Sequence, residues 1–521
     1  MSSSDEVGRA KIETFQPWRC SSRTRLEPTN PEAPVTNALR LMALYPCGTM
    51  PGRFAAMAQD TTPVNSITKS HDHLAEVRRT LQLAIPVVLG QVAIFSMNFV
   101  DTVMSGHLPQ KDIALAGLGV GGSIWSALMM FTIGMLMAVQ PSVAHLDGAG
   151  RRLEAGALTR QALWIALFIA VPYWAVCYFS EHLLQLFRID PVIIPVAAGY
   201  LRAISWGAPA LCLIFLLRFF SEGAGRTRPT MFYGILGAAL NIPLNYTLMF
   251  GHFGFPALGT IGCGYATAIV IWLQLGMVLS YLGMHHHFKP FELFHRIDAP
   301  RWREIASLLH LGIPIAVSVS LENLLFVGAA LLIGRLGPLP SAAHLVAINF
   351  SALVFMIPLG MSSAVAVRVG NALGRKDPAS ARYAGIVGIL LVAVSQCVNM
   401  TVMFVFPAQI VGMYTDDSAV AAMAVSLLFY AAVFQLPDGI QICSAGALRG
   451  LKDTKIPMLF NLVAYWLVGM SLGYYLTFSV GLGPAGMWIG MIAGLSVGAV
   501  LLTGRFLQRT SRLIRSAPVN A

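Results

Sequence analysis

From residue 81 onward the sequence consists of long apolar stretches separated by short polar links, and no other feature constrains the fold as strongly. Twelve stretches are long enough for a membrane-spanning helix, which needs about 20 mostly apolar residues. Only 11% of the residues are charged, against roughly one quarter in soluble domains. The sequence therefore predicts an all-α polytopic membrane protein with spans near residues 81–107, 114–143, 161–180, 192–220, 229–250, 259–283, 305–336, 343–369, 384–406, 419–447, 456–478 and 485–507.

The basic residues of the links predict the orientation of these spans. An even number of spans places both ends of the chain on one side of the membrane. Fifteen Lys and Arg residues, Arg449 among them, fall in the links on that side, and only three or four fall in the opposite links. Because cytoplasmic links carry an excess of Lys and Arg, we expect both termini in the cytoplasm and the chain in the cell inner membrane. This placement explains the net charge of +11 without nucleic acid as a partner.

The two halves of the apolar region resemble each other. The motif "LAIP" at Leu83–Pro86 recurs as "LGIP" at Leu311–Pro314, and Gly134-Met135 recurs as Gly360-Met361. Six spans separate the copies, so both halves enter the membrane in the same direction. We therefore expect two pseudo-symmetric six-helix bundles with a cleft between them.

This repeat divides the chain into segments. We expect a disordered cytoplasmic tail at 1–79, an N-terminal bundle at 80–284, a cytoplasmic linker at 285–304, a C-terminal bundle at 305–508 and a cytoplasmic tail at 509–521. Met50 and Met57 offer later start codons, a hypothesis that mass spectrometry of the native N-terminus would test. The linker contains three adjacent histidines, but neighbours on one strand rarely converge on a metal ion, so we expect a plain solvated segment.

Three acidic side chains lie within the predicted spans and away from their ends, namely Asp101, Glu322 and Asp438. A charge in hydrocarbon costs about 2.5–3.5 kcal/mol on insertion scales, so such groups usually face an internal cavity. The arginines of the spans lie near boundaries, where their side chains reach the interface; they are Arg202, Arg218 and Arg368. A cavity with carboxylates and no clear basic partner attracts cations or takes up protons, so we expect the transported charge to be positive.

Polar side chains gather at one depth of the N-terminal bundle. Asp101 lies late in an outward-running span, and Asn241 and Asn245 share one face of the fifth span because they are four residues apart. Thr267 lies early in the inward-running sixth span, again in the outer half. These oxygen-bearing groups suit a hard monovalent cation or a proton. The plainer interpretation is an interfacial aspartate, with asparagines that only join helices.

The acidic groups of the C-terminal bundle lie near mid-depth. Glu322 has long apolar runs on both sides. Asp438 follows Pro437 and precedes Gly439, where we expect a broken helix to free backbone carbonyls. In the first span, Pro86 is either a tolerated kink or a hinge.

These motifs together resemble a known family. The segments "FVDTVMSG", "LNIPLNY", "LEN" and "PDGIQICSAGALRGLKDTKIP" lie in spans one, five, seven and ten to eleven. Their order and depth are similar to the multidrug and toxin extrusion (MATE) family, bacterial norfloxacin-efflux type, over roughly residues 80–507. The resemblance implies a multidrug efflux transporter, not an enzyme, that exports small cationic lipophilic drugs in antiport with sodium ions or protons. We expect a monomer and no cofactor besides this coupling ion.

The resemblance also implies site residues in the N-terminal bundle. By motif, Asp101, Asn241, Asn245 and Thr267 correspond to the family's cation and substrate site there. Pro86 corresponds to the proline whose helix bends when that site changes state. Pro86 is therefore the expected helix hinge.

In the C-terminal bundle the resemblance assigns Glu322 and Asp438 to the second cation site. Together with Asp101 they are the carboxylates expected to ligate sodium. Some relatives carry a tyrosine four residues before the second carboxylate, where this chain has Phe434. The ligand set, and with it the choice between sodium and proton, stays open.

Three other functions compete with this one. A lipid-linked oligosaccharide flippase of the same wider superfamily would be expected to use basic cavity residues for pyrophosphate, and the spans offer none that is clear. A membrane prenyltransferase would need a DDxxD pair, which Asp416 and Asp417 do not form. A passive channel would show no dependence on an ion gradient, which separates it from an antiporter.

Overall fold

Helices account for all the regular structure in the residues that the computed structural model describes, which are 73–108, 111–296 and 298–516. Most of the expected N-terminal tail, with both candidate start codons, lies outside them. The first half contains α3 (His73–Ser105), α4 (Lys111–Leu136), α5 (Val139–Gly148), α6 (Arg152–Tyr178), α7 (Ser180–Leu186), α8 (Ile194–Ser205), α9 (Ala208–Gly223), α10 (Arg228–Phe250) and α11 (Thr260–Met284). The second contains α12 (Trp302–Gly334), α13 (Pro338–Gly374), α14 (Pro378–Val405), α15 (Pro407–Gly412), α16 (Ser418–Gly450), α17 (Lys455–Leu462), η2 (Val463–Met470), α18 (Ser471–Tyr474), η3 (Tyr475–Ser479) and α19 (Pro484–Ser516).

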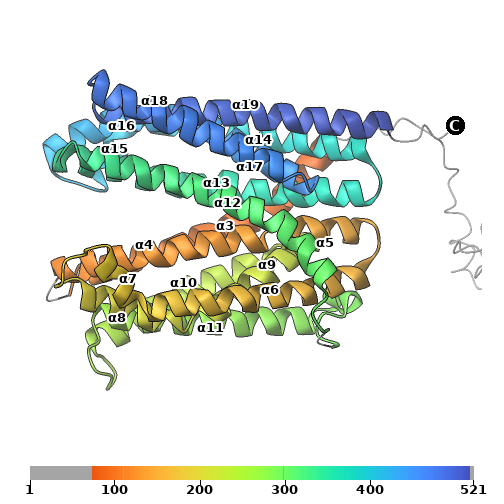
Figure 1. Cartoon of the computed structure of the whole chain (residues 1–521), viewed down its shortest axis with the longest axis horizontal. Helices are drawn as coiled ribbons and strands as arrows, with labels where there is room; N and C mark the ends of the chain where they lie inside the picture. Colours follow the sequence, from red (N-terminus) through yellow and green to blue (C-terminus); the bar gives the residue numbers. More distant parts are fainter. Residues whose placement is uncertain (1–72, 109–110, 297, 517–521) are drawn as a thin grey trace, which may run out of the picture. The chain divides into compact units, whose positions relative to one another are not determined.

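The number of membrane spans agrees with the sequence. Ten helical stretches of the described residues are long and apolar enough to cross a membrane, and the pair α8 and α9, bent by 52°, adds an eleventh. The remaining predicted span is α10, which has 23 residues but is less apolar because it carries asparagines and prolines. Figure 1 shows α4 to α11 on one side and α13 to α19 on the other, with α3 and α12 running between the two groups. The predicted fold of two six-helix bundles is confirmed.

The first and last helices extend beyond their predicted apolar stretches, and both form ion pairs with other segments. α3 begins at His73, so residues 73–79 are helical, and its buried Glu76 accepts a hydrogen bond from Arg368 of α13 at 2.9 Å. The expectation that Arg368 merely reaches the interface is wrong. α19 continues to Ser516, where a short tail was expected from residue 509, and Arg505 pairs with Asp453 at 3.0 Å on the way.

The segment between the bundles is docked against α6 and is not plainly solvated as expected. It contains the 3-10 helix η1 (His286–Phe291), whose Phe288 and Phe291 are buried in the N-terminal core. Asp298 accepts a hydrogen bond from Arg160 at 2.7 Å and forms an ion pair with Arg296 at 2.8 Å. The hydrogen bond from Arg160 lowers the pKa of Asp298 below its ordinary value. The carboxylate therefore fastens the segment to α6; we call the end of the molecule that carries it the linker side.

Glycines allow the two bundles to approach each other closely on the linker side. A Cβ atom at any of three of them would overlap the backbone of the other bundle, namely Gly134 at Ala316, Gly148 at Asn371 and Gly374 at His145. Gly134 and Gly148 belong to the continuous stretch α4 to α5, and Gly374 ends α13. The backbones are thus in direct contact along the linker-side halves of these helices.

The opposite side lacks such a shared core in the described residues. The hydrophobic cluster there runs from Leu325 to Leu495 and contains residues of the C-terminal bundle alone. By contrast, the cluster that contains Val143 also takes in Ile305 and Ala316 of α12. The bundles are therefore joined at the linker side and have separate cores away from it.

The linker-side contact makes Gly148 sensitive to a single methyl group. We expect Gly148→Ala to destabilise this arrangement by about 1–3 kcal/mol, because Asn371 is backbone and must move. Gly122→Ala is the matched control, since no atom lies within 4 Å of a Cβ there. Thermal unfolding of the purified protein in detergent measures the difference. Equal melting temperatures for both variants would contradict the close contact.

Candidate functional site

The four residues predicted in the N-terminal bundle converge on one buried point. Asp101 comes from α3, Asn241 and Asn245 from α10, and Thr267 from α11. The Nδ2 of Asn245 donates hydrogen bonds to Asp101 Oδ1 at 2.6 Å and to Asn241 Oδ1 at 3.0 Å. Thr267 Oγ1 donates to Asp101 Oδ2 at 3.5 Å. All four side chains are buried, so Asp101 is not an interfacial residue with a hydrated head.

This cluster lacks a positive charge. Asp101 forms no ion pair with any residue that the structure describes. Asn245 Oδ1 and Asn241 Nδ2 also find no hydrogen-bond partner there. A buried carboxylate needs a counter-charge or a proton, because hydrogen bonds from neutral groups offset only part of its desolvation. The geometry can therefore hold a cation or a proton at Asp101.

The C-terminal bundle brings Glu322 of α12 and Asp438 of α16 near each other, close enough for their charges to interact. Both side chains are buried, and one oxygen of each, Oε1 and Oδ1, has no hydrogen-bond partner among the described residues. Glu322 lines a cavity of about 30 Å³ together with Gln441 and Arg449. A cavity of this size has room for a water molecule or a small ion.

Arg449 corrects the prediction that the carboxylates have no basic neighbour. It is buried near the end of α16, where the sequence placed it in a cytoplasmic link. Its guanidinium donates to Ser362 Oγ at 2.7 Å, and no oxygen of Glu322 lies within ion-pair distance. Glu322 thus has one arginine in its surroundings, but neither Glu322 nor Asp438 forms an ion pair within the described residues.

Sequence reasoning missed Tyr465, which contributes a phenol to the same region. Gln441 Nε2 donates a hydrogen bond to its hydroxyl, and the side chain is fully buried. Tyr465 lies in η2, a π-helical segment of the eleventh span, and π-helical turns are frequent at functional sites. Phe434 instead packs edge-on against Phe326 and Trp488 in the core. No periodicity signal in the sequence marks a π-helical turn.

Two predictions about prolines meet different outcomes. The helix break expected at Pro437 is wrong, since α16 continues from Ser418 to Gly450 with Pro437 inside it. Gly439, next to Asp438, packs against the side chain of Gln396. A larger residue at position 439 would overlap that side chain, which explains the glycine. Pro86 also lies inside one uninterrupted helix, α3, so its hinge role stays a prediction.

A further buried acid lies on the linker side and was missed because α9 extends past the predicted end of span four. Glu222 is completely buried and accepts a hydrogen bond from Arg218 at 2.8 Å. Gln140 Nε2 donates to Glu222 Oε2 at 2.6 Å, and Ser363 Oγ of the other bundle donates to the same oxygen at 3.2 Å. Arg218 therefore belongs to an internal network, and the expectation that it reaches the interface is wrong.

The remaining acidic motifs and histidines have structural positions. Asp417 caps α16 by accepting hydrogen bonds from the backbone amides of Ala419 and Val420. No three His, Cys, Asp or Glu side chains of the described residues are placed to share a metal ion. Asp101 and the pair of C-terminal carboxylates lie in different bundles, so they do not form a single sodium site.

Comparison with known proteins identifies the family. A family model described as MatE matches the chain twice, over residues 86–247 and 314–475, which together exceed half of its length. The chain belongs to the MatE family. The two matches begin at Pro86 and Pro314, the prolines of the repeated motifs, and they confirm the twofold organisation of this MatE chain.

Relatives of this MatE protein cover almost its whole apolar region. The probable multidrug resistance protein NorM of Xanthomonas campestris pv. campestris is 45% identical over 457 residues, which cover 88% of this chain and 99% of that protein. The multidrug resistance protein PmpM of Pseudomonas aeruginosa is 41% identical over 446 residues, which cover 85% and 93% of the two chains. The resemblance inferred from the motifs is confirmed.

Solved structures agree with the fold. The crystal structure of the eukaryotic MATE transporter AtDTX14 matches with a TM-score of 0.76 at 20% identity, over 85% of this chain and 99% of that chain. At this identity the likeness concerns the fold alone. The MatE protein described here is thus a multi-pass membrane protein of a transporter family.

The N-terminal cluster yields a test by double-mutant cycle. We expect Asn245→Leu to destabilise the protein by about 1–3 kcal/mol, because Asp101 loses its main hydrogen-bond donor while it stays buried. Adding Asp101→Leu should cost less than the two single changes together, because the unsatisfied carboxylate is then gone. Thr247→Val serves as the control, since its hydroxyl is exposed and bonds only within α10. Additive changes in melting temperature would contradict the coupling.

Proposed function

We propose that this MatE-family protein is a multidrug efflux transporter that exports small cationic lipophilic compounds in antiport with sodium ions or protons. It acts as a monomer in the cell inner membrane, with both termini cytoplasmic and no cofactor besides the coupling ion. The observation that carries the proposal is the presence, in each bundle, of buried carboxylates without an ion-pair partner among the described residues. The proposal agrees with the names of the two relatives, which are called multidrug resistance proteins.

The charge of the two sites supports a positive cargo. At the N-terminal site Asp101 is surrounded by amides and a hydroxyl. At the C-terminal site Glu322 interacts with Asp438 on one hand and with the guanidinium of Arg449 on the other. When its acids are ionised, each site has a formal charge of −1, so one monovalent cation or one proton neutralises it. A cationic drug competes for the same negative charge.

Exchange follows from this competition when the bundles have two arrangements. The described arrangement is joined on the linker side; because the linker is basic, we place this side in the cytoplasm, so the expected cleft opens outward. Entry of one positive charge down 100 mV releases ~2.3 kcal/mol, which drives coupling-ion uptake. A drug that binds better to the inward-open arrangement is then carried outward.

A lipid-linked oligosaccharide flippase remains the alternative, since Arg449 is a basic residue in a cavity. One arginine beside Glu322 is a poor site for a pyrophosphate, because that carboxylate and its neighbour Asp438 repel the negative charges of the ligand. Export of cationic drugs from proteoliposomes, measured against transfer of a lipid-linked pyrophosphate, separates the two functions.

The C-terminal carboxylates provide the direct test of antiport. We expect Glu322→Gln and Asp438→Asn each to abolish gradient-driven export of a fluorescent lipophilic cation, because neutral amides no longer attract a coupling ion. Asp416→Asn is the control, since Asp416 is exposed in the link before α16. The assay uses proteoliposomes with the sodium and pH gradients imposed separately, which also identifies the coupling ion. Export at the unmodified rate by both site variants would refute the assignment.

The network around Glu222 predicts that a substitution there changes the equilibrium between arrangements of the bundles that are closed and open on the linker side. Ser363→Ala removes two hydrogen bonds between the bundles, the one that Ser363 Oγ donates to Glu222 at 3.2 Å and the one that it accepts from Gln140 Nε2 at 2.9 Å. Since a net hydrogen bond is worth about 1 kcal/mol, we expect a shift of roughly five- to thirty-fold toward arrangements open on the linker side. Distances between spin labels on the linker-side ends of α5 and α13 measure it.

Ser351→Ala is the matched control for this experiment. Ser351 lies on the same helix, is equally buried, and donates only to the carbonyl of Ala347 in α13. Its substitution should leave the distance distribution unchanged. An unchanged distribution for Ser363→Ala as well would show that the cross-bundle bonds do not hold the linker side closed.

A further inference from the structure

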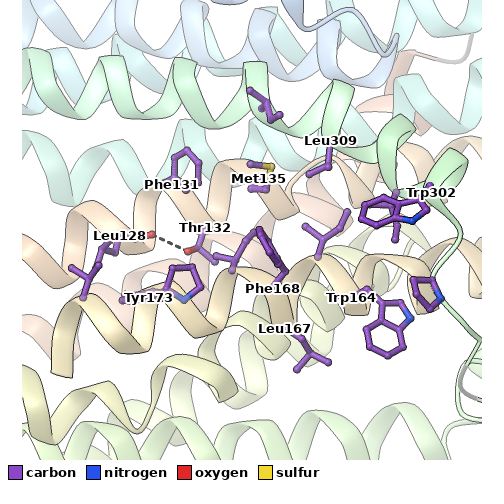
Figure 2. Close-up of a pocket in the computed structure, with 17 residues that line it drawn as sticks. Leu128, Phe131, Thr132, Met135, Trp164, Leu167, Phe168, Tyr173, Trp302 and Leu309 are labelled. Atoms are coloured by element: carbon purple, nitrogen blue, oxygen red, sulfur yellow. Dashed lines mark hydrogen bonds between the residues drawn. The ribbon is translucent and has the colours of Figure 1, made fainter. Parts of the chain in front are cut away.

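A large apolar cavity lies apart from both carboxylate sites. Its volume is about 820 Å³, and its walls come from α4, α6, the start of α12 and the linker residue Pro300. Figure 2 shows Phe131, Met135, Phe168 and Leu309 around it. Because α4 and α6 belong to one bundle and α12 to the other, an occupant of this cavity contacts both.

The cavity faces the hydrocarbon of the membrane. Three of its lining residues are strongly exposed although they are apolar: Phe168 by 79%, Trp302 by 76% and Ile313 by 47%. All three belong to helices that are long and apolar enough to span the bilayer. The cavity is therefore accessible from the side, within the membrane, to hydrophobic molecules dissolved there.

Apart from Trp302 Nε1 at the exposed linker end, the polar groups of the lining are already satisfied within the protein. Thr132 Oγ1 donates to the carbonyl of Leu128 at 2.8 Å, the bond drawn in Figure 2. The hydroxyl of Tyr173 donates to the carbonyl of Trp125 at 2.9 Å, and Trp164 Nε1 donates to that of Asp298 at 3.0 Å. A molecule in the interior of the cavity therefore gains van der Waals attraction but no new hydrogen bond. Such a lining favours a hydrocarbon chain.

The charges next to the linker end of the cavity are mostly positive. Pro300 and Trp302 line it, and Arg301 and Arg303 adjoin them in the chain. Arg301 pairs with Glu304 at 3.1 Å, whereas Arg303 is exposed and forms no ion pair within the described part of the chain. The nearby Asp298 is already engaged by two arginines. A negative head group at this end would be attracted and a cationic one repelled.

We propose that this cavity binds an acyl chain of an anionic phospholipid, with the lipid phosphate at Arg303. A cationic drug fits less well, because the cavity offers it neither a carboxylate nor a free acceptor and the adjacent charges are arginines. The site is separate from the proposed transport sites, and lipid binding does not depend on which cargo is exported. The lipid acyl chain fills the space between α6 and α12 and so supports the linker-side contact of the bundles.

Native mass spectrometry of the full chain released from nanodiscs tests the proposal. The nanodiscs contain phosphatidylcholine alone or a mixture of phosphatidylcholine and phosphatidylglycerol, and the retained lipid is identified by its mass. We expect retained phosphatidylglycerol from the mixture and little retained phosphatidylcholine. Since one arginine near the surface contributes about 1 kcal/mol, Arg303→Gln should lower this retention roughly five-fold. Arg512→Gln is the control, because Arg512 is likewise exposed and without an ion pair in the described residues.

A second pair of variants tests whether the acyl chain of the retained lipid lies in the cavity. Ile313→Trp adds volume in the cavity and should reduce retention, whereas Leu331→Trp, on the exposed face of the same helix and outside the cavity, should not. Equal retention by these two variants would overturn the site. Equal retention of phosphatidylglycerol and phosphatidylcholine would overturn the role of the head group. Displacement of the retained lipid by a lipophilic cation at low concentration would show a drug site instead.

Discussion

Hydrocarbon does not solvate charge, and the structure depends on how each buried ionisable group is compensated. One set is paired inside the protein: Arg218 with Glu222 at 2.8 Å and Arg368 with Glu76 at 2.9 Å. Another set, represented by Asp101, has hydrogen bonds but no partner of opposite charge among the described residues. Paired groups can stay inside the bundle in every state, whereas an unpaired carboxylate requires an ion or a proton from outside. In the proposed antiport, this difference separates structural charges from charges that bind the coupling ion.

The paired groups and the tight contacts of glycine lie in the same half of the molecule. Gly148 and Gly374 let the backbones of the two bundles touch where Ser363 reaches Glu222. Such an interface has few intermediate positions, because backbone contacts and a buried hydrogen bond are lost together when the bundles move apart. The linker is fastened to α6 through Asp298 on this same side of the molecule.

Much of the fold could be predicted from the sequence because the membrane imposes a simple rule, that about 20 apolar residues make one span. The N-terminal site could be predicted for a similar reason: Asn241 and Asn245 share a helix face by their spacing, and Asp101 is an acid in an apolar span. Glu222 could not be predicted as a buried residue, because α9 extends beyond the apolar stretch that marks the fourth span. Tertiary packing sets the length of such a helix. It also determines where the π-helical turn that carries Tyr465 forms.

Arg449 also could not be placed from the sequence, since a basic residue at the end of a span is typical of a cytoplasmic link. In the structure it is buried beside Glu322, without a direct ion pair, and its guanidinium donates to Ser362. Its charge reduces the formal charge of the site from −2 to −1 when both acids are ionised, so that a single monovalent cation suffices. In the proposed antiport, this arginine lowers the negative charge that a coupling ion meets at Glu322 without replacing the ion, because it does not pair with the carboxylate directly.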